Sequence, residues 1–169
     1  MEQILFYILS IGAIFGGLIV ITRKNPLHCA LFLVLTFFFI AGLYLILGAY
    51  FLSMIQVIVY AGAIMVLFLF VIMFVNLEKE EEPKENHIVQ RFWGISLSIL
   101  LGIVLFLAIK IQLVKGLMGE YSPEKVEAAG NAQSVARVLF TDYLIPFEVA
   151  SILLLVAIVG AVVLAKKEL

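Results

Sequence analysis

The fold is decided by residues 29–77, which read CALFLVLTFFFIAGLYLILGAYFLSMIQVIVYAGAIMVLFLFVIMFVNL. None of these 49 residues is Asp, Glu, Lys, Arg or His. A single helix of this length would extend for about 73 Å, roughly twice the thickness of a bilayer. The segment therefore has to turn back once. The turn signal lies at 48–53, where Gly48 ends one helix and Ser53 is the candidate N-cap of the next.

The composition agrees with a chain that lies mostly in lipid. Of the 169 residues, 64% are hydrophobic and 14% are charged, and the mean hydropathy is +1.20. So few charged side chains cannot cover a soluble protein of this length, which argues against a soluble globular enzyme. The net charge of −1 argues against nucleic-acid binding. The single cysteine, Cys29, excludes an internal disulfide framework.

Two further segments add to the membrane architecture. The apolar run 4–21 ends at Arg23, Lys24 and Pro26, and it is interpreted as a retained helix because Glu2 stands where a signal peptide would be positive. The segment 122–130 has the Ser, Pro and Gly typical of a short surface helix. The sequence thus predicts an all-α integral membrane protein, with a single membrane domain over 1–169, five transmembrane helices at about 3–22, 28–48, 53–77, 92–114 and 143–165, and polar loops at 78–91 and 115–142.

The lysines and arginines predict the orientation of these helices. With the N-terminus outside (periplasmic) and the C-terminus cytoplasmic, seven basic residues face the cytoplasm and four face outward, as the positive-inside rule requires. The inner set is Arg23, Lys24, Lys79, Lys84, Arg91, Lys166 and Lys167, and the outer set is Lys110, Lys115, Lys125 and Arg137.

The usual catalytic and metal-binding patterns are missing from the sequence. His28 and His87 are the only histidines, and neither has a metal-ligand partner at helical spacing. His28 beside Cys29 fits an interfacial pair better than a site. There is no phosphate-binding loop and no Ser/His/Asp set. The sequence predicts no active site, metal or cofactor on this chain alone.

Gly12 and Gly16 form a small-xxx-small face on the first helix. Small residues let helix backbones approach closely in lipid. Packing within the chain is the favoured interpretation, and docking against another membrane subunit is the alternative.

Gln56 and Tyr60 stand four residues apart on the third helix, which predicts that they share a face. The small residues around Gly62 follow directly. From the residues alone, a close helix contact is favoured there over a π-bulge, which is a typical functional irregularity.

Asp142 and Glu148 are the acids at the start of the fifth helix. The helix dipole favours an acid there, whereas an ionisable group inside the membrane suggests a proton path. The two interpretations are balanced for Glu148, and the structural one is favoured for Asp142. No acid or base lies in the middle of the first four helices, so a self-contained proton pump is not expected.

Three segments resemble a known family. Residues 56–73, QVIVYAGAIMVLFLFVIM, are similar to the third helix of the J subunits of proton-pumping NADH:quinone oxidoreductase, respiratory complex I, whose mitochondrial counterpart is the sixth mitochondrially encoded subunit. The segments RKNPLH at 23–28 and LFTDYLIPFEVAS at 139–151 resemble the same family. The resemblance covers essentially the whole chain, less clearly at 78–91 and 115–137.

The resemblance implies a non-catalytic subunit of the membrane arm in the inner membrane of a prokaryote. Its partners would be the lipid bilayer, the quinone-site subunit and the small three-helix subunit. NADH, FMN, iron–sulfur clusters and quinone would all be bound by other subunits. In that family the third helix can switch between a regular α-helix and a π-bulge, which makes or breaks a water path between the quinone site and the pumping modules. The matching positions here are Tyr60, Gly62, Met65, Val66 and Phe68.

A second hypothesis from a different class is a stand-alone or homo-oligomeric membrane transporter or scaffold. It would use Gly12 and Gly16 for self-association. The lack of an acid–base pair in mid-membrane argues against it.

Overall fold

The computed structural model describes residues 1–75, 88–110 and 121–166, and all regular structure in these ranges is helical. The chain divides into two compact units. The first comprises 1–76 and 123–169, and the second comprises 77–122. Predictions for 78–87, 111–114 and 115–120 lie outside the described residues, as do those for Lys79, Lys84, His87, Lys115 and Lys167.

Five helices in the described ranges are long and apolar enough to cross a membrane. They are α1 (Glu2–Thr22), α2 (Pro26–Ile46), the third span (Tyr50–Phe74), the part Phe92–Lys110 of α5 (Ile88–Lys110), and α8 (Leu144–Ala165). The third span consists of α3 (Tyr50–Ile55), the π-helix η1 (Gln56–Ile64) and α4 (Met65–Phe74). Helices suit lipid because each satisfies its own backbone hydrogen bonds.

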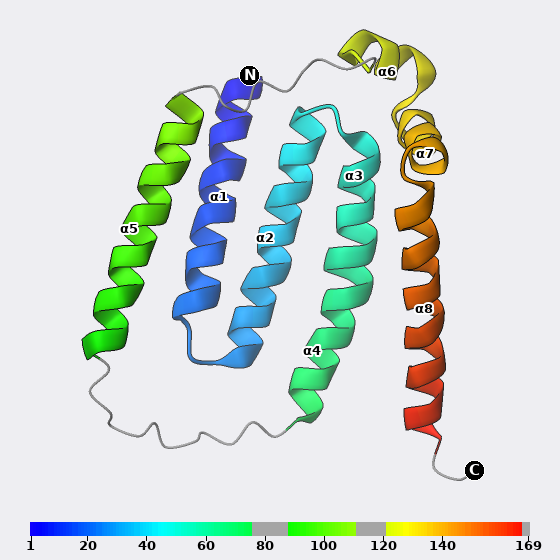
Figure 1. Ribbon diagram of the computed structural model, residues 1–169. Helices are drawn as coiled ribbons and strands as arrows, with labels where there is room; N and C mark the ends of the chain where they lie inside the picture. Colours follow the sequence, from blue (N-terminus) through cyan, green and yellow to red (C-terminus); the bar gives the residue numbers. More distant parts are fainter. Residues whose placement is uncertain (76–87, 111–120, 167–169) are drawn as a thin grey trace. The chain divides into compact units, whose positions relative to one another are not determined.

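α2 packs against α1 on one side and against the third span on the other (Figure 1). A Cβ at Gly12 would lie 2.7 Å from the Phe39 ring, and one at Gly16 would collide with the Thr36 hydroxyl. The two glycines therefore let α1 approach α2 closely. This packing occupies the face that the self-association hypothesis needs.

α2 begins at Pro26, two residues earlier than the sequence predicts. Asn25 is its N-cap, and its side chain accepts hydrogen bonds from the backbone N–H groups of Leu27 (3.0 Å) and His28 (3.4 Å). Proline is tolerated at the first helical position because its missing N–H would have no partner there. Pro26 therefore starts this helix.

α2 ends in a glycine turn, as expected, near Gly48. Gly48 has a positive φ of 71°, its N–H donates to the Leu45 carbonyl (3.1 Å), and the Ala49 N–H donates to the Tyr44 carbonyl (2.9 Å). These are the two hydrogen bonds of a Schellman motif. Only three residues, 47–49, therefore separate α2 from α3.

The prediction that Ser53 is the N-cap of the third span is wrong. The span begins at Tyr50, and Ser53, only 4% exposed, donates a hydrogen bond from Oγ to the Ala41 carbonyl (2.8 Å). The cap comes from a distant residue, because the Phe51 N–H donates to Asn131 Oδ1 (3.0 Å). A free N–H in the first turn of a helix needs such an acceptor.

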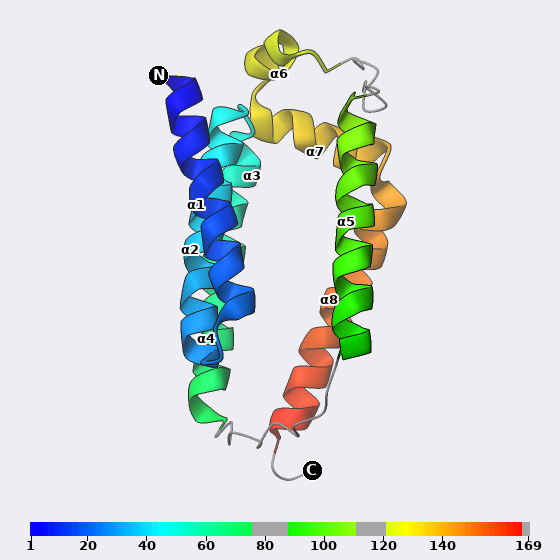
Figure 2. The same ribbon diagram turned by 90° about the vertical axis from the view of Figure 1, so that its left-hand side faces the viewer.

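The polar segment after α5 contains two helices where the sequence predicts one. α6 (Pro123–Ala129) matches the predicted surface helix and ends at Gly130, whose φ is 90°. α7 (Asn131–Thr141) follows at once and was not predicted. It packs against α3 and α8, and Figure 2 shows it between them.

Candidate functional site

The middle of the third span is wound as a π-helix. η1 covers nine residues, Gln56–Ile64, and at its end the Met65 N–H donates to the carbonyl of Tyr60 as well as to that of Gly62. A hydrogen bond from residue i to i−5 defines the π-helix, whereas an α-helix would pair Met65 with Ala61. Passing to an α-helix would therefore move this N–H to the next carbonyl along.

The buried residues of the third span follow the same wide turn. Gln56 (9% exposed), Ala61 (5%) and Met65 (4%) are its buried positions within and next to η1, the part that packs against α2. Their spacing is five and then four residues, where an α-helix averages 3.6. One extra residue is thus accommodated between Gln56 and Ala61.

The wide turn separates Gln56 from Tyr60, which the sequence places on one face. Tyr60 is 46% exposed, while Gln56 is buried. The prediction assumed α-helical spacing, and in η1 it is Ala61 that follows Gln56 on the inner face. The Tyr60 ring packs edge-on against Phe37 of α2, with 5.6 Å between ring centroids. No hydrogen bond joins the side chain of Tyr60 or Gln56 to another described residue.

Gly62 suits the π-helical winding because it has no Cβ. A Cβ at this position would lie 3.2 Å from the carbonyl oxygen of Val57, which is closer than ordinary van der Waals contact. Any other residue would have to push that turn open by a few tenths of an ångström. The glycine therefore favours the wide turn locally.

The remaining matched positions lie on α4. Met65 is buried, and Val66 and Phe68 are about half exposed. Phe68 and Ile72 also line a hollow of about 410 Å³, which extends to Arg23 and Lys24 at the turn between α1 and α2. A rotation of α4 would therefore reshape this hollow.

Asp142 and Glu148 are not brought to η1. Asp142 is the C-cap of α7, and Glu148 is the fifth residue of α8; both are exposed. Among the described elements, α8 packs only against α7. Among the described residues, Glu148 therefore lies on a helix that does not contact the third span, whereas Asp142 ends a helix that packs against α3.

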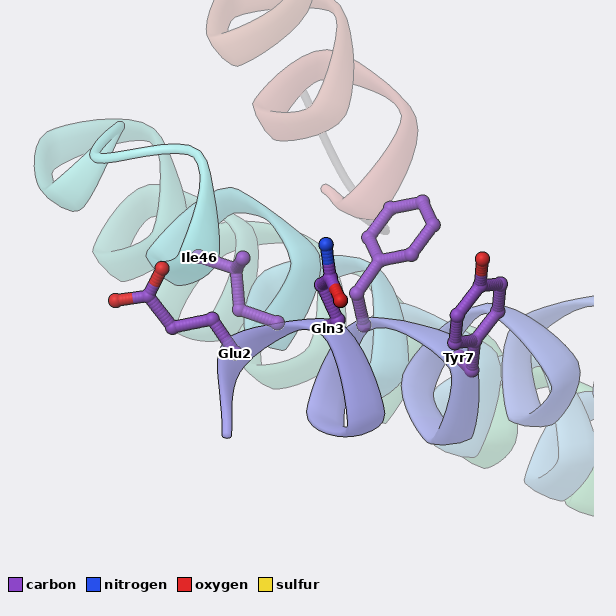
Figure 3. A pocket seen from close by; sticks show the side chains of 5 residues that line it. Glu2, Gln3, Tyr7 and Ile46 are labelled. Atoms are coloured by element: carbon purple, nitrogen blue, oxygen red, sulfur yellow. The ribbon is translucent and has the colours of Figure 1, made fainter.

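The described residues hold no cluster of three or more metal-ligating side chains. Cys29 donates a hydrogen bond from Sγ to the Arg23 carbonyl (3.2 Å), which ties it to the turn before α2. A hollow of about 230 Å³ lies near the start of α1. In Figure 3 the Glu2 carboxylate and the Tyr7 hydroxyl lie apart, at opposite ends of the side chains that line this hollow. They do not form an acid–base pair.

Sequence reasoning missed Asn131. Its amide accepts from the Phe51 N–H and donates from Nδ2 to the Gly48 carbonyl, both at 3.0 Å. The available signal was an Asn after a glycine, at the start of an amphipathic segment. The partners lie about 80 positions away in sequence, so no local pattern could identify them.

Known proteins resemble the chain over nearly its full length. The family described as NADH-ubiquinone/plastoquinone oxidoreductase chain 6 matches residues 16–164. NADH-quinone oxidoreductase subunit J of Escherichia coli (strain K12) is 37% identical, over 96% of this chain and 86% of the relative. Subunit J of Rhodobacter capsulatus is 35% identical, over 96% and 81%. The chloroplastic NAD(P)H-quinone oxidoreductase subunit 6 of Physcomitrium patens is 36% identical, over 99% and 86%. The chain therefore belongs to the family of NADH-quinone oxidoreductase chain 6, also called subunit J.

Proposed function

We propose that this chain couples quinone reduction to proton translocation in NADH:quinone oxidoreductase, through a change of helical register in η1. The observation that carries the proposal is the nine-residue π-helix in the third span. π-helical turns are rare and occur frequently at functional sites. Membership of the subunit J family supplies the complex in which such an element would act.

A change from π to α register has a defined consequence for the residues beyond it. If α3 stays fixed, each downstream residue takes the angular position of its successor, a turn of about 100°. Tyr60 would then occupy the inner position of Ala61, beside α2, and Ile64 would occupy that of Met65. A polar hydroxyl would enter or leave the buried seam that contains Gln56. Such a two-state element could open and close a water path.

The same proposal covers the cofactors of the complex, the neighbours of this subunit and its orientation in the membrane. NADH, FMN, iron–sulfur clusters and quinone are bound by other subunits, and this subunit is non-catalytic. Its neighbours are the quinone-site subunit and the small three-helix subunit, in the inner membrane of a prokaryote. The N-terminus is periplasmic and the C-terminus cytoplasmic, because the basic residues are distributed as the positive-inside rule requires.

Native gel electrophoresis of detergent-extracted membranes tests the assembly part of this proposal. We expect the chain in a large complex that shows flavin and iron–sulfur absorbance and oxidises NADH with a quinone acceptor. A species of only one or a few copies of the 18.8 kDa chain would contradict the proposal and support the homo-oligomer hypothesis.

Tyr60→Phe is expected to leave assembly normal and to lower coupled turnover by about two- to fivefold, the effect of losing the one net hydrogen bond that the hydroxyl would gain at the inner position in the α register. The ring and its contact with Phe37 are retained, so only the hydroxyl is tested. The measurement is NADH:quinone turnover with proton pumping in membrane vesicles. Tyr50→Phe, at the start of the same span and outside η1, is the matched control. Wild-type turnover in both variants would assign Tyr60 to packing alone.

Glu148→Gln is expected to change proton pumping by less than about twofold. Glu148 lies about 6 Å from the start of α8, where the helix dipole and nearby water favour a carboxylate without any role in proton transfer. Pumping would be measured in vesicles, beside Asp142→Asn. A tenfold loss of pumping in the assembled Glu148→Gln complex would instead identify a proton carrier.

A further inference from the structure

We propose that Asn131 is a positioning residue that holds the start of the third span fixed, so that a change of register in η1 turns α4 and leaves α3 in place. The inference rests on the proposed function and adds the residue that determines which half of the third span turns. Asn131 is the first residue of α7, about 80 positions away in sequence from the turn it contacts.

One side-chain amide joins both sides of the turn between α2 and α3. Asn131 Oδ1 accepts from the Phe51 N–H, and Asn131 Nδ2 donates to the Gly48 carbonyl, both at 3.0 Å. Phe51 is in the first turn of α3, where backbone N–H groups have no partner within the helix. Gly48 is the residue of positive φ that ends α2. The acceptor and the donor of the amide are thus both used on backbone groups of this turn.

A third side-chain hydrogen bond joins α3 to α2. Ser53 Oγ donates to the Ala41 carbonyl of α2 at 2.8 Å, and Ser53 is buried. Residues 48–53 are therefore held by three side-chain hydrogen bonds, to α2 and to α7. Hydrogen bonds depend on direction as well as distance, so these bonds resist rotation of α3 about its own axis.

α4 has no comparable restraint. Its sequence, MVLFLFVIMF, contains no side chain that makes a conventional hydrogen bond, and it packs against α2 through apolar contacts. Apolar contacts are non-directional, so a turned helix can exchange one set for another. A register change in η1 requires one half of the span to turn relative to the other. We expect α4 to be the half that turns, because its rotation breaks no side-chain hydrogen bond to another element.

Loss of the Asn131 contacts removes this asymmetry. α3 has only six residues, and without its cap it can absorb the register change itself. The change would then not reach Met65 and Phe68. Quinone reduction would continue, but fewer protons would be translocated for each electron.

The experiment compares Asn131→Ala with Ser134→Ala in the assembled complex. The Ser134 side chain is buried on α7, but its hydrogen bond, to the Gly130 carbonyl at 2.9 Å, links it to no residue of the third span. We expect Asn131→Ala to lower the ratio of protons to electrons at least about twofold, the lower bound for one lost net hydrogen bond. Ser134→Ala should keep the wild-type ratio. A purely structural role would lower the amount of complex and leave this ratio unchanged.

Gly62→Val, measured alongside, separates the two proposals. An unchanged ratio in Asn131→Ala, with coupled turnover lowered in Gly62→Val, overturns the role of Asn131 and leaves the proposed function intact. Wild-type behaviour of both variants overturns the register switch itself. Should Asn131→Ala fail to assemble, Asn131→Leu is judged by the same ratio, since it is similar in size but offers neither the acceptor for the Phe51 N–H nor the donor to the Gly48 carbonyl. Density maps of two registers in which 48–55 turn and 65–74 stay fixed would also overturn the proposal.

Discussion

Gly62→Val is expected to leave the complex assembled and to lower coupled quinone reduction about fivefold, which corresponds to about 1 kcal/mol. In η1 a Cβ at this position would lie 3.2 Å from the Val57 carbonyl oxygen. Valine adds two further methyl groups and a restricted χ1 angle, which crowd the same turn. The substitution therefore raises the free energy of the π register relative to the α register.

The expected loss follows from the change in population. Forcing extra atoms into a packed site costs about 1–3 kcal/mol, and each 1.4 kcal/mol is a factor of ten in a two-state equilibrium. A switch held in one register no longer transmits quinone chemistry to the pumping modules. Gly62 is not among the buried residues that face α2, so stability should change little.

Ala63→Val is the matched control for Gly62→Val. Ala63 is exposed, lies next to Gly62 in η1, and already carries a Cβ. The control therefore adds the same β-branch without creating the contact with Val57. The measurements are NADH:quinone turnover and proton uptake in vesicles, normalised to the assembled complex. Equal turnover in both variants and wild type would exclude a register switch that depends on Gly62.

The five spans could be predicted because lipid imposes a strong constraint on sequence. Each span needs about 20 apolar residues, and the charged segments between them are conspicuous. The end of α2 was predictable too, because glycine adopts a positive φ, as Gly48 does here, without steric cost. These features depend on local composition, so a single sequence is enough to identify them.

The start of the third span could not be predicted in the same way. Ser53 looks like an N-cap because serine is a preferred residue there, yet Asn131 supplies the acceptor for the Phe51 N–H. A cap donated from another element leaves no local signal. Ser53 is then available to bond to Ala41 of α2. The three-residue error in the helix boundary therefore has a tertiary cause.

The π-helix leaves little trace in the composition. Its buried positions, Gln56, Ala61 and Met65, differ in spacing from an α-helical stripe by one residue. In a span where nearly every residue is apolar, hydropathy does not distinguish inner from outer positions. The residues alone favoured a plain helix contact, and only the resemblance to subunit J favoured a bulge. The α7 helix was not predicted either; it packs against α3, which is far away in sequence, as well as against α6 and α8, its neighbours along the chain.

The largest loss of stability is expected for Gly16→Val, in the contact between α1 and α2. Gly16 is a buried residue of α1, and a Cβ there would collide with the Thr36 hydroxyl. That hydroxyl donates to the Phe32 carbonyl at 2.8 Å, so moving it breaks a hydrogen bond. Overpacking costs about 1–3 kcal/mol, and changes of about 1–2 kcal/mol alter the abundance of a protein severalfold. We expect the amount of assembled complex to fall about fivefold, with normal activity in what remains.

Two comparisons make the Gly16 prediction specific. Gly17 is adjacent on α1, but no atom lies within 4 Å of a Cβ built there, so Gly17→Val should leave the amount of complex unchanged. Thr36→Ala removes the colliding oxygen, after which the nearest atom to a Cβ on Gly16 is the Thr36 Cβ at 3.5 Å, an ordinary contact. Gly16→Ala should therefore lower the amount of complex alone and be rescued by Thr36→Ala. An additive effect of the two substitutions would mean that Gly16 does not pack against Thr36 in the membrane.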